Sequence, residues 1–264
     1  ILGSLGSGNA AGLCISDDYA LVAGEGGSIS VSNCSASPLG FWWRSTDGMQ
    51  PLPFDDARFC GSIALDTSES GSIIVGGQSI GGDNFVAAYW ENGSLREIGT
   101  FGGSKSIAEG TDRLGQVIVG SSQESDGKWK AFYWQAGQMN RLSTPIGYES
   151  VAFEVDHSGR VVVGSVGTDE RFQNARAVRW VDNRLEDLND IFACILREGE
   201  TLHAATTISA NGRYIAGVGS RNGTFDVFVI DDICYSHNGD VNCDRCVDDA
   251  DLLIVISLMG ECYL

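Results

Sequence analysis

The stretch at residues 106–134 reads SIAEGTDRLGQVIVGSSQESDGKWKAFYW, and variants of it recur five times along the chain. Every variant contains a run of mostly β-branched residues that ends in glycine. These glycines lie 52, 44, 44 and 53 residues apart, at Gly24, Gly76, Gly120, Gly164 and Gly217. A short aromatic strand keeps a similar period, at residues 40–43, 87–90, 131–134, 177–180 and 227–230. Because two unrelated motifs share one period, the sequence indicates five structural repeats.

Each repeat predicts four short strands separated by Gly, Asp, Asn and Ser turns. In the central repeat these strands are 107–110, 116–120, 130–134 and 139–142. Four strands at this period are typical of one blade of a β-propeller. We therefore expect an all-β fold: a five-bladed β-propeller of four-stranded blades over residues 1–232, followed by a separate tail over residues 233–264.

The two ends of the repeat region predict how the propeller closes. Residues 1–5 resemble the segment that begins other repeats, whereas the last repeat stops after residues 227–230 without a fourth strand. We expect residues 1–5 to complete the last blade. This pairing would join the first strand of the chain to the last and remove an open sheet edge.

The first strand of each repeat carries a small residue, which predicts a position beside the central axis, where space is shortest. Ser or Asp stands four residues later, which is eight residues before the glycine that ends the β-branched run, or ten in the second repeat because of an insertion. These positions are Ser16, Asp66, Asp112, Asp156 and Ser209. They could form a ring of carboxylates and hydroxyls for catalysis or metal binding, or they could cap the following turn. Because Ser and Asp interchange, we interpret them as turn caps.

The repeat pattern S-x-A … D-x-x-G-x-V-x-V-G-S … A-F-x-W … M-x-x-L resembles the HAF-type repeats of bacterial and archaeal secreted proteins. The resemblance covers residues 1–232. It implies a β-propeller architecture and an extracellular location, and it implies no particular reaction.

The tail contains the sharpest local motif, NGDVNCDRCVDDAD at residues 238–251. Its oxygen-bearing groups follow the spacing of an EF-hand-type calcium loop, in which one tight turn brings six to eight oxygens around the ion. The candidate Ca²⁺ ligands are Asp240, Asn242, Asp244, the backbone carbonyl of Cys246, Asp248 and Asp251. Residues 239–260 resemble one half of a dockerin, a resemblance that implies calcium binding.

The tail departs from the dockerin pattern, and it permits two other interpretations. A dockerin has two such loops and this chain has one, and Arg245 stands where glycine is usual. The acidic residues could instead cap a helix without metal. Four cysteines could also form a zinc site, namely Cys234, Cys243, Cys246 and Cys262.

Composition limits the environment and the partners. The net charge is −18 without a basic block, so contacts that neutralise phosphates are hard to build and nucleic acid is not expected as a partner. No apolar run reaches the length of a membrane span. The eight cysteines favour disulfides in an oxidising compartment. With a chain that begins at Ile1, they predict a secreted, extracellular protein, whose candidate glycosylation sites are Asn33, Asn92 and Asn222.

Motifs for catalysis are weak in this sequence. The three histidines lie in unrelated contexts, and Glu154 is the carboxylate that we place on a first strand. We assign the tryptophans that recur in the aromatic strands to packing between blades. Trp129 lies outside that register and is the better candidate for an exposed contact with a sugar.

Three functional hypotheses follow. The first is a secreted, non-enzymatic structural or adhesive protein that self-associates through its calcium-ordered tail into a homo-oligomer or filament. The second is an extracellular module that binds carbohydrate or surface glycans, as a lectin does. The third is a glycoside hydrolase, which would require two carboxylates facing each other across the channel.

Overall fold

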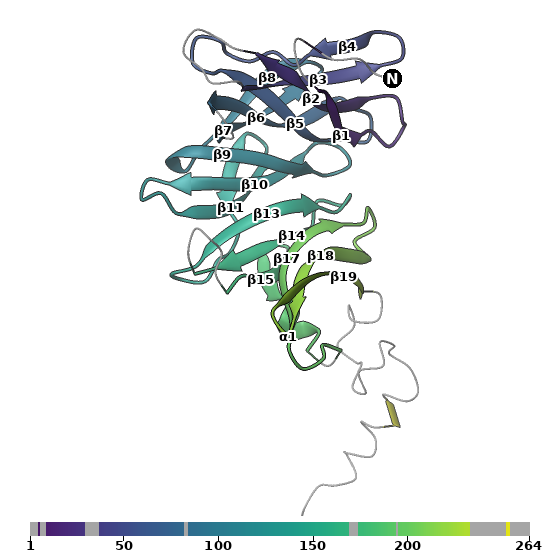
Figure 1. Ribbon diagram of the computed structural model, residues 1–264, viewed down its shortest axis with the longest axis vertical. Coiled ribbons are helices and arrows are strands. Elements are labelled where there is room, and N and C mark those ends of the chain that lie inside the picture. The colour runs from purple at the N-terminus through teal and green to yellow at the C-terminus, as the bar shows by residue number, and fades with distance from the viewer. Residues whose placement is uncertain are drawn as a thin grey trace, which may run out of the picture.

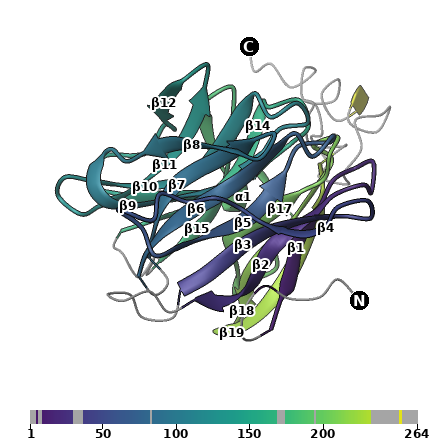
Figure 2. The same cartoon turned by 90° about the horizontal axis from the view of Figure 1, so that it is seen from above.

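The computed structural model describes residues 5, 9–29, 37–81, 84–168, 174–193, 195–232 and 252–253. These residues form five antiparallel sheets in chain order, and each of the first four sheets has four strands. The sheets follow one another from top to bottom of Figure 1, and seen from above they overlap (Figure 2). The predicted all-β fold is confirmed.

Each sheet corresponds to one sequence repeat, and its strands follow chain order across the sheet. Sheet 1 contains β1 (Ala11–Ile15), β2 (Val22–Ile29), β3 (Ser37–Arg44) and β4 (Gly48–Pro51). Sheet 2 contains β5 (Gly61–Thr67), β6 (Ile73–Gly81), β7 (Asn84–Glu91) and β8 (Ser94–Gly99). Sheet 3 contains β9 (Gly102–Thr111), β10 (Val117–Glu124), β11 (Trp129–Gln135) and β12 (Gln138–Arg141). Sheet 4 contains β13 (Glu149–Val155), β14 (Val161–Gly167), β15 (Arg176–Val181) and β16 (Arg184–Asp187). Sheet 5 contains β17 (Glu200–Ile208), β18 (Tyr214–Arg221) and β19 (Thr224–Asp231), and the short helix α1 (Leu188–Ile191) precedes it.

A β-bulge interrupts the first strand of every sheet at the same place. In sheet 2 the register passes from Ala64 opposite Gly76 to Asp66 opposite Val75, which leaves Leu65 as the extra residue. Equivalent shifts occur in the other four sheets. The strands approach closely here, because a Cβ built on Gly76 would lie 2.0 Å from the carbonyl oxygen of Ile63. The glycine that ends each β-branched run is thus required by backbone contact.

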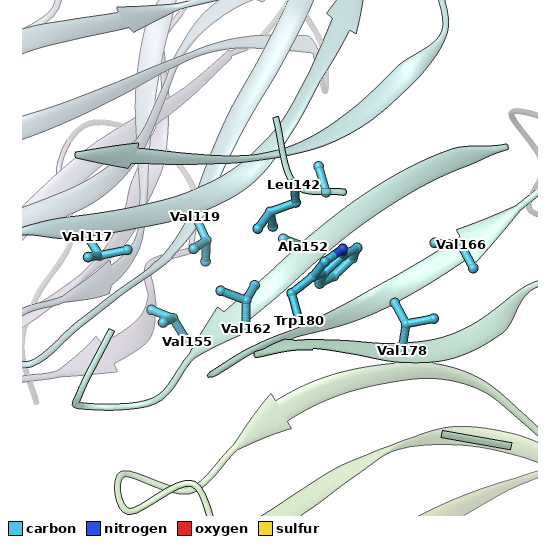
Figure 3. Close-up of a cluster of buried hydrophobic side chains, with 10 residues drawn as sticks. Val117, Val119, Leu142, Ala152, Val155, Val162, Val166, Val178 and Trp180 are labelled. Atoms are coloured by element: carbon cyan, nitrogen blue, oxygen red, sulfur yellow. The ribbon is translucent and has the colours of Figure 1, made fainter. Parts of the chain in front are cut away.

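The core consists of apolar layers between neighbouring sheets. Between sheets 3 and 4, Val119 and Leu142 pack against Ala152 and Trp180 (Figure 3). Trp180 is fully buried, and its indole N–H donates a hydrogen bond to the carbonyl of Ser143 at 2.6 Å. Trp90 is equally buried and donates to the carbonyl of Pro53 at 2.7 Å. These two tryptophans have the packing role predicted for them.

The turn after each first strand is capped by a side chain, as predicted for four of the five repeats. Asp112 accepts hydrogen bonds from the backbone N–H groups of Gln116 (2.6 Å) and Val117 (2.8 Å). Residues Ser16, Asp156 and Ser209 accept equivalent bonds. In the second repeat the cap is Ser68, which accepts from the N–H of Ile73 at 3.1 Å. The assignment of Asp66 as a cap was therefore wrong, because the repeat needs no insertion at that point.

Leu5 does not pair with the last strand, as the predicted closure by residues 1–5 requires. Its backbone N–H donates to the carbonyl of Gly26 at 2.8 Å, which places Leu5 beside β2 in sheet 1 and not beside β19. Residues 1–4 lie outside the described part of the chain. Among the residues that the structure describes, sheet 5 has three strands and β19 is its edge.

Candidate ligand-binding site

One position on the first strand of each sheet is occupied by a chemically different residue in each of the five repeats. It directly follows the bulge and precedes the turn cap by two residues. Its five occupants are Cys14, Asp66, Gly110, Glu154 and Thr207. The architecture does not require any one residue type here, since thiol, carboxylate, glycine and hydroxyl all occur.

Three carboxyl groups gather around this position from three sheets. Burial raises the pKa of Asp66 to about 6, although a hydrogen bond from the N–H of Thr111 at 2.9 Å lowers it in part. Burial also raises the pKa of Glu109, the bulge residue of sheet 3, to about 7. The pKa of Glu154 rises to about 8 because of burial first and the negative charge of Asp66 second. At neutral pH, Glu154 therefore mostly keeps its proton, Glu109 is present in both forms, and Asp66 is mostly ionised.

Gly110 provides the space into which the Glu154 side chain extends. A Cβ built on Gly110 would lie 2.6 Å from Oε1 of Glu154. The same oxygen accepts a hydrogen bond from the N–H of Val155 at 3.0 Å. The carboxyl group of sheet 4 therefore reaches the first strand of sheet 3, where Glu109 precedes Gly110.

A cavity of about 370 Å³ opens between sheets 2 and 3, and Glu109 is the one of these three carboxyl groups that lines it. Its walls come from β5 and β9 and from the starting residues of β7 and β11. The lining residues include Leu65, Phe85, Lys105, Ile107, Glu109 and Trp129. The cavity thus combines two aromatic rings and aliphatic walls with one carboxyl group of raised pKa, a combination typical of small-molecule sites.

Trp129 is held in place at this cavity by its own backbone. Its N–H donates a hydrogen bond of 2.7 Å to Oε2 of Glu149, a residue buried at the start of β13. The indole ring is half-buried and lines the cavity. The sequence singled out Trp129 because it breaks the tryptophan register, whereas Phe85 and Glu109 were missed.

Two smaller cavities recur at equivalent places between sheets. One of about 190 Å³ lies between sheets 1 and 2, and one of about 210 Å³ lies between sheets 3 and 4. Each is bordered by the residue that opens a β-branched run, Leu21 in one and Val117 in the other. Their repetition makes them a feature of blade packing.

The remaining predicted site residues fall into two groups. The Ca²⁺ ligands proposed in the tail, Asp240, Asn242, Asp244, Cys246, Asp248 and Asp251, lie outside the described residues. Within the described ranges, no group of three His, Cys, Asp or Glu side chains has a geometry that could hold a metal ion. His203 has a structural environment, with Nδ1 3.0 Å from the carbonyl of Ala175 and Nε2 2.8 Å from Oγ of Ser220.

The cysteine predictions can be followed at two positions. Cys14 is a free thiol on β1, and burial raises its pKa to about 12, so it carries no charge at neutral pH. Cys60 is buried just before β5. The other six cysteines lie outside the described residues, and their pairing stays a prediction. In the described part of the chain, no helix is long and apolar enough to cross a membrane.

Comparison with solved structures identifies the fold as a β-propeller. A putative TolB from Agrobacterium tumefaciens superposes with a TM-score of 0.55 at 11% identity, over 84% of this chain and 76% of that one. The propeller domain of the trilobed protease from Pyrococcus furiosus, described as having an open velcro topology, gives a TM-score of 0.52 at 11% identity over 84% and 67% of the two chains. No family model and no curated protein matches the sequence. The HAF-type and dockerin resemblances therefore remain predictions.

The prediction of a non-enzymatic protein was wrong, because structures with a similar propeller include enzymes. Puromycin hydrolase superposes with a TM-score of 0.58 at 12% identity, over 88% of this chain and 38% of that one. The propeller therefore occurs as part of larger enzymes. The structure also brings Asp66 and Glu109 near Glu154, the one carboxylate that the sequence placed on a first strand.

Proposed function

We propose that the protein is a secreted β-propeller that binds carbohydrate in the cavity between sheets 2 and 3. The observation that carries this proposal is Trp129 on the wall of a cavity that also holds the Glu109 carboxyl group. A sugar ring offers an apolar C–H face and a rim of hydroxyls. An aromatic ring contacts the face, and a few polar groups fix the orientation of the rim.

The chemistry of Glu109 suits hydroxyl groups. With a pKa of about 7, this carboxyl group exists in both forms at neutral pH, so it can donate or accept a hydrogen bond. Lys105 and Asn84 add a cation and an amide to the lining. The volume of about 370 Å³ is at the small end for ligand sites, which favours a short saccharide or the end of a glycan chain.

Binding to a glycan array, followed by calorimetry on the best ligand, tests this proposal. We expect Trp129→Ala to weaken binding at least tenfold, because the contact with the sugar face is lost. Tyr19→Asn is the matched control: it removes an aromatic side chain that is 80% exposed, at a φ of 57° that asparagine tolerates. Failure of the wild-type protein to bind any saccharide, or equal binding by both variants, would refute the proposal.

Glycoside hydrolysis is a second candidate, favoured by carboxyl groups whose pKa values differ. Glu154, with a pKa of about 8, would hold the proton that a leaving sugar needs, while Asp66, at about 6, ionises more readily. We expect Glu154→Gln to abolish the release of reducing sugar while saccharide binding persists. Release that is no faster for the wild type than for Glu154→Gln would exclude hydrolysis by this group.

We also propose that the tail binds one Ca²⁺ ion and supports self-association, which rests on the ligand spacing in the sequence alone. Calorimetric titration of the full chain should give one bound Ca²⁺, lost in Asp240→Asn and in Asp251→Asn. Asp249→Asn is the matched control, since Asp249 stands outside the ligand spacing. Full Ca²⁺ binding by the Asp251→Asn variant would argue for an acidic helix cap instead.

A further inference from the structure

The face of sheet 5 that points away from sheet 4 is apolar and open to solvent. Three alternate residues of β19 form its outer row: Phe225 is 75% exposed, Val227 79% and Val229 71%. Tyr214 and Val218 on β18 extend the face and are 42% and 38% exposed. On the opposite face, Ile215 and Ile230 are buried against sheet 4. Sheet 5 is therefore apolar on both faces, and among the described residues one of these faces has no covering sheet.

The repeat shows what normally covers this face. Val227 pairs with Val218, the residue after the glycine anchor of β18. The same position is occupied by Ala87 in sheet 2, Ala131 in sheet 3 and Ala177 in sheet 4. All three alanines are fully buried against the next sheet of the stack. Val227 is thus the one of these four that no following sheet covers in the part of the chain that the structure describes.

Sheet 1 presents the complementary face. In sheets 2 and 4 a branched residue of the second strand pairs with a tryptophan of the third, and the pair packs against the preceding sheet: Ile74 with Trp90, and Val162 with Trp180. The corresponding pair in sheet 1 is Val22 and Trp43. Neither is fully buried, and Ile15, which pairs with Val22, is 52% exposed. Within the described ranges, sheet 1 is the first sheet and no other sheet packs on this face.

We infer that the exposed face of sheet 5 binds the exposed face of sheet 1 from a second copy of this chain. This contact would repeat the arrangement already present at four places inside the molecule, between sheets 1 and 2 through to sheets 4 and 5. The chain's own sheet 1 leaves Val227 and Val229 bare, and the two sheets lie at opposite ends of the stack (Figure 1).

The contact is heterologous, because two different faces meet. Each copy keeps one free sheet 1 face and one free sheet 5 face, so association continues head to tail until it closes into a ring or grows into a filament. This association uses neither the cavity between sheets 2 and 3 nor the calcium segment, and it is therefore independent of the proposed functions.

Sedimentation equilibrium of the full chain over a concentration series tests the inference, in Ca²⁺ and in EGTA. We expect the mean mass to rise with concentration in both buffers. Val227→Lys should weaken association at least tenfold, because it places a charge in an apolar contact, and it should not impair folding because the side chain is exposed in the single molecule. Ile146→Lys is the control, since Ile146 is fully exposed in the segment that precedes β13.

Mixing two blocked variants gives a signature that no other arrangement produces. Val227→Lys blocks the sheet 5 face and leaves sheet 1 free, whereas Ile15→Lys does the reverse. In EGTA, which removes any association through the calcium segment, each variant alone should be monomeric, and their mixture should give one-to-one dimers and nothing larger. A wild type that is monomeric in EGTA would show that the chain covers its own face and would overturn the inference. So would undiminished association of Val227→Lys in EGTA.

Discussion

At the scale of single residues, the candidate site depends on side chains that the repeat does not dictate. Glu109 is the extra residue of a β-bulge, and a bulge breaks the alternation from which the direction of a strand residue is predicted. Asp66 is not a turn cap, because Ser68 stands at the regular spacing of eight residues before Gly76 and accepts the capping hydrogen bond. The role of Trp129 could be predicted from the sequence. The other tryptophans recur at one position of the repeat and pack between sheets, whereas Trp129 stands at a different position and so requires another explanation.

The buried carboxyl groups predict a stability that falls as the pH rises. Their folded-state pKa values, about 7 for Glu109 and about 8 for Glu154, exceed those of an unfolded chain, so the folded protein holds more protons between about pH 4.3 and 8. The free energy of unfolding should decrease from pH 5 to pH 8, by an amount on the order of a few kcal/mol. Urea denaturation across this interval measures it.

Removing the titrating group should remove its share of this dependence. Glu154→Gln is expected to be more stable than the wild type at pH 8 and to show a flatter profile, because its side chain has no proton to lose. Asp126→Asn is the control, since Asp126 is exposed. The backbone N–H of Lys128 and then its ammonium group lower the pKa of Asp126, which keeps it ionised throughout the interval. An unchanged slope for Glu154→Gln would mean that this carboxyl group is solvated in the folded protein.

At the scale of strands and turns, the repeat makes the local structure predictable. The four strands expected in the central repeat all exist as β9 to β12, with longer bounds for three of them. Five aligned repeats separate the positions that a blade requires from those that vary. The bulges were not predicted, since small residues and glycines mark a close approach of strands without showing which residue is extra.

The turn caps predict the effect of substituting Asp112, and the serine that caps the equivalent turn of another repeat suggests the control variant. Asp112→Ala removes the acceptor of two backbone N–H groups and should lower the free energy of unfolding by about 1–2 kcal/mol. Asp112→Ser should recover much of this loss, because Ser68 caps the equivalent turn by one such bond. Denaturant titration of the three proteins compares them. If serine were as damaging as alanine, the interchange of Ser and Asp would need another cause than capping.

At the scale of the whole molecule, each sheet packs against its neighbours in chain order, and the turns after the first strands also approach one another across the molecule: Asp17 of sheet 1 lies 3.5 Å from His157 of sheet 4. The sequence predicted the number and order of the repeats, because these depend on local pattern. It did not predict the pairing of the N-terminal residues, because a strand that resembles other strands can pair with any free edge. Leu5 lies beside β2, and the end sheets each keep one apolar face without a covering sheet.

Such a series should open from its ends. Sheets 1 and 5 are each covered on one face, whereas sheet 3 is covered on both, so the end sheets should open locally at lower free energy. Hydrogen exchange followed by mass spectrometry, at a concentration where the chain is monomeric, should show β19 exchanging at least tenfold faster than β10. Raising the concentration should slow exchange in β19 and leave β10 unchanged, and Val227→Lys should abolish that slowing. Uniform protection of all five sheets in the dilute monomer would instead indicate one closed ring, in which sheet 1 covers sheet 5 of the same molecule.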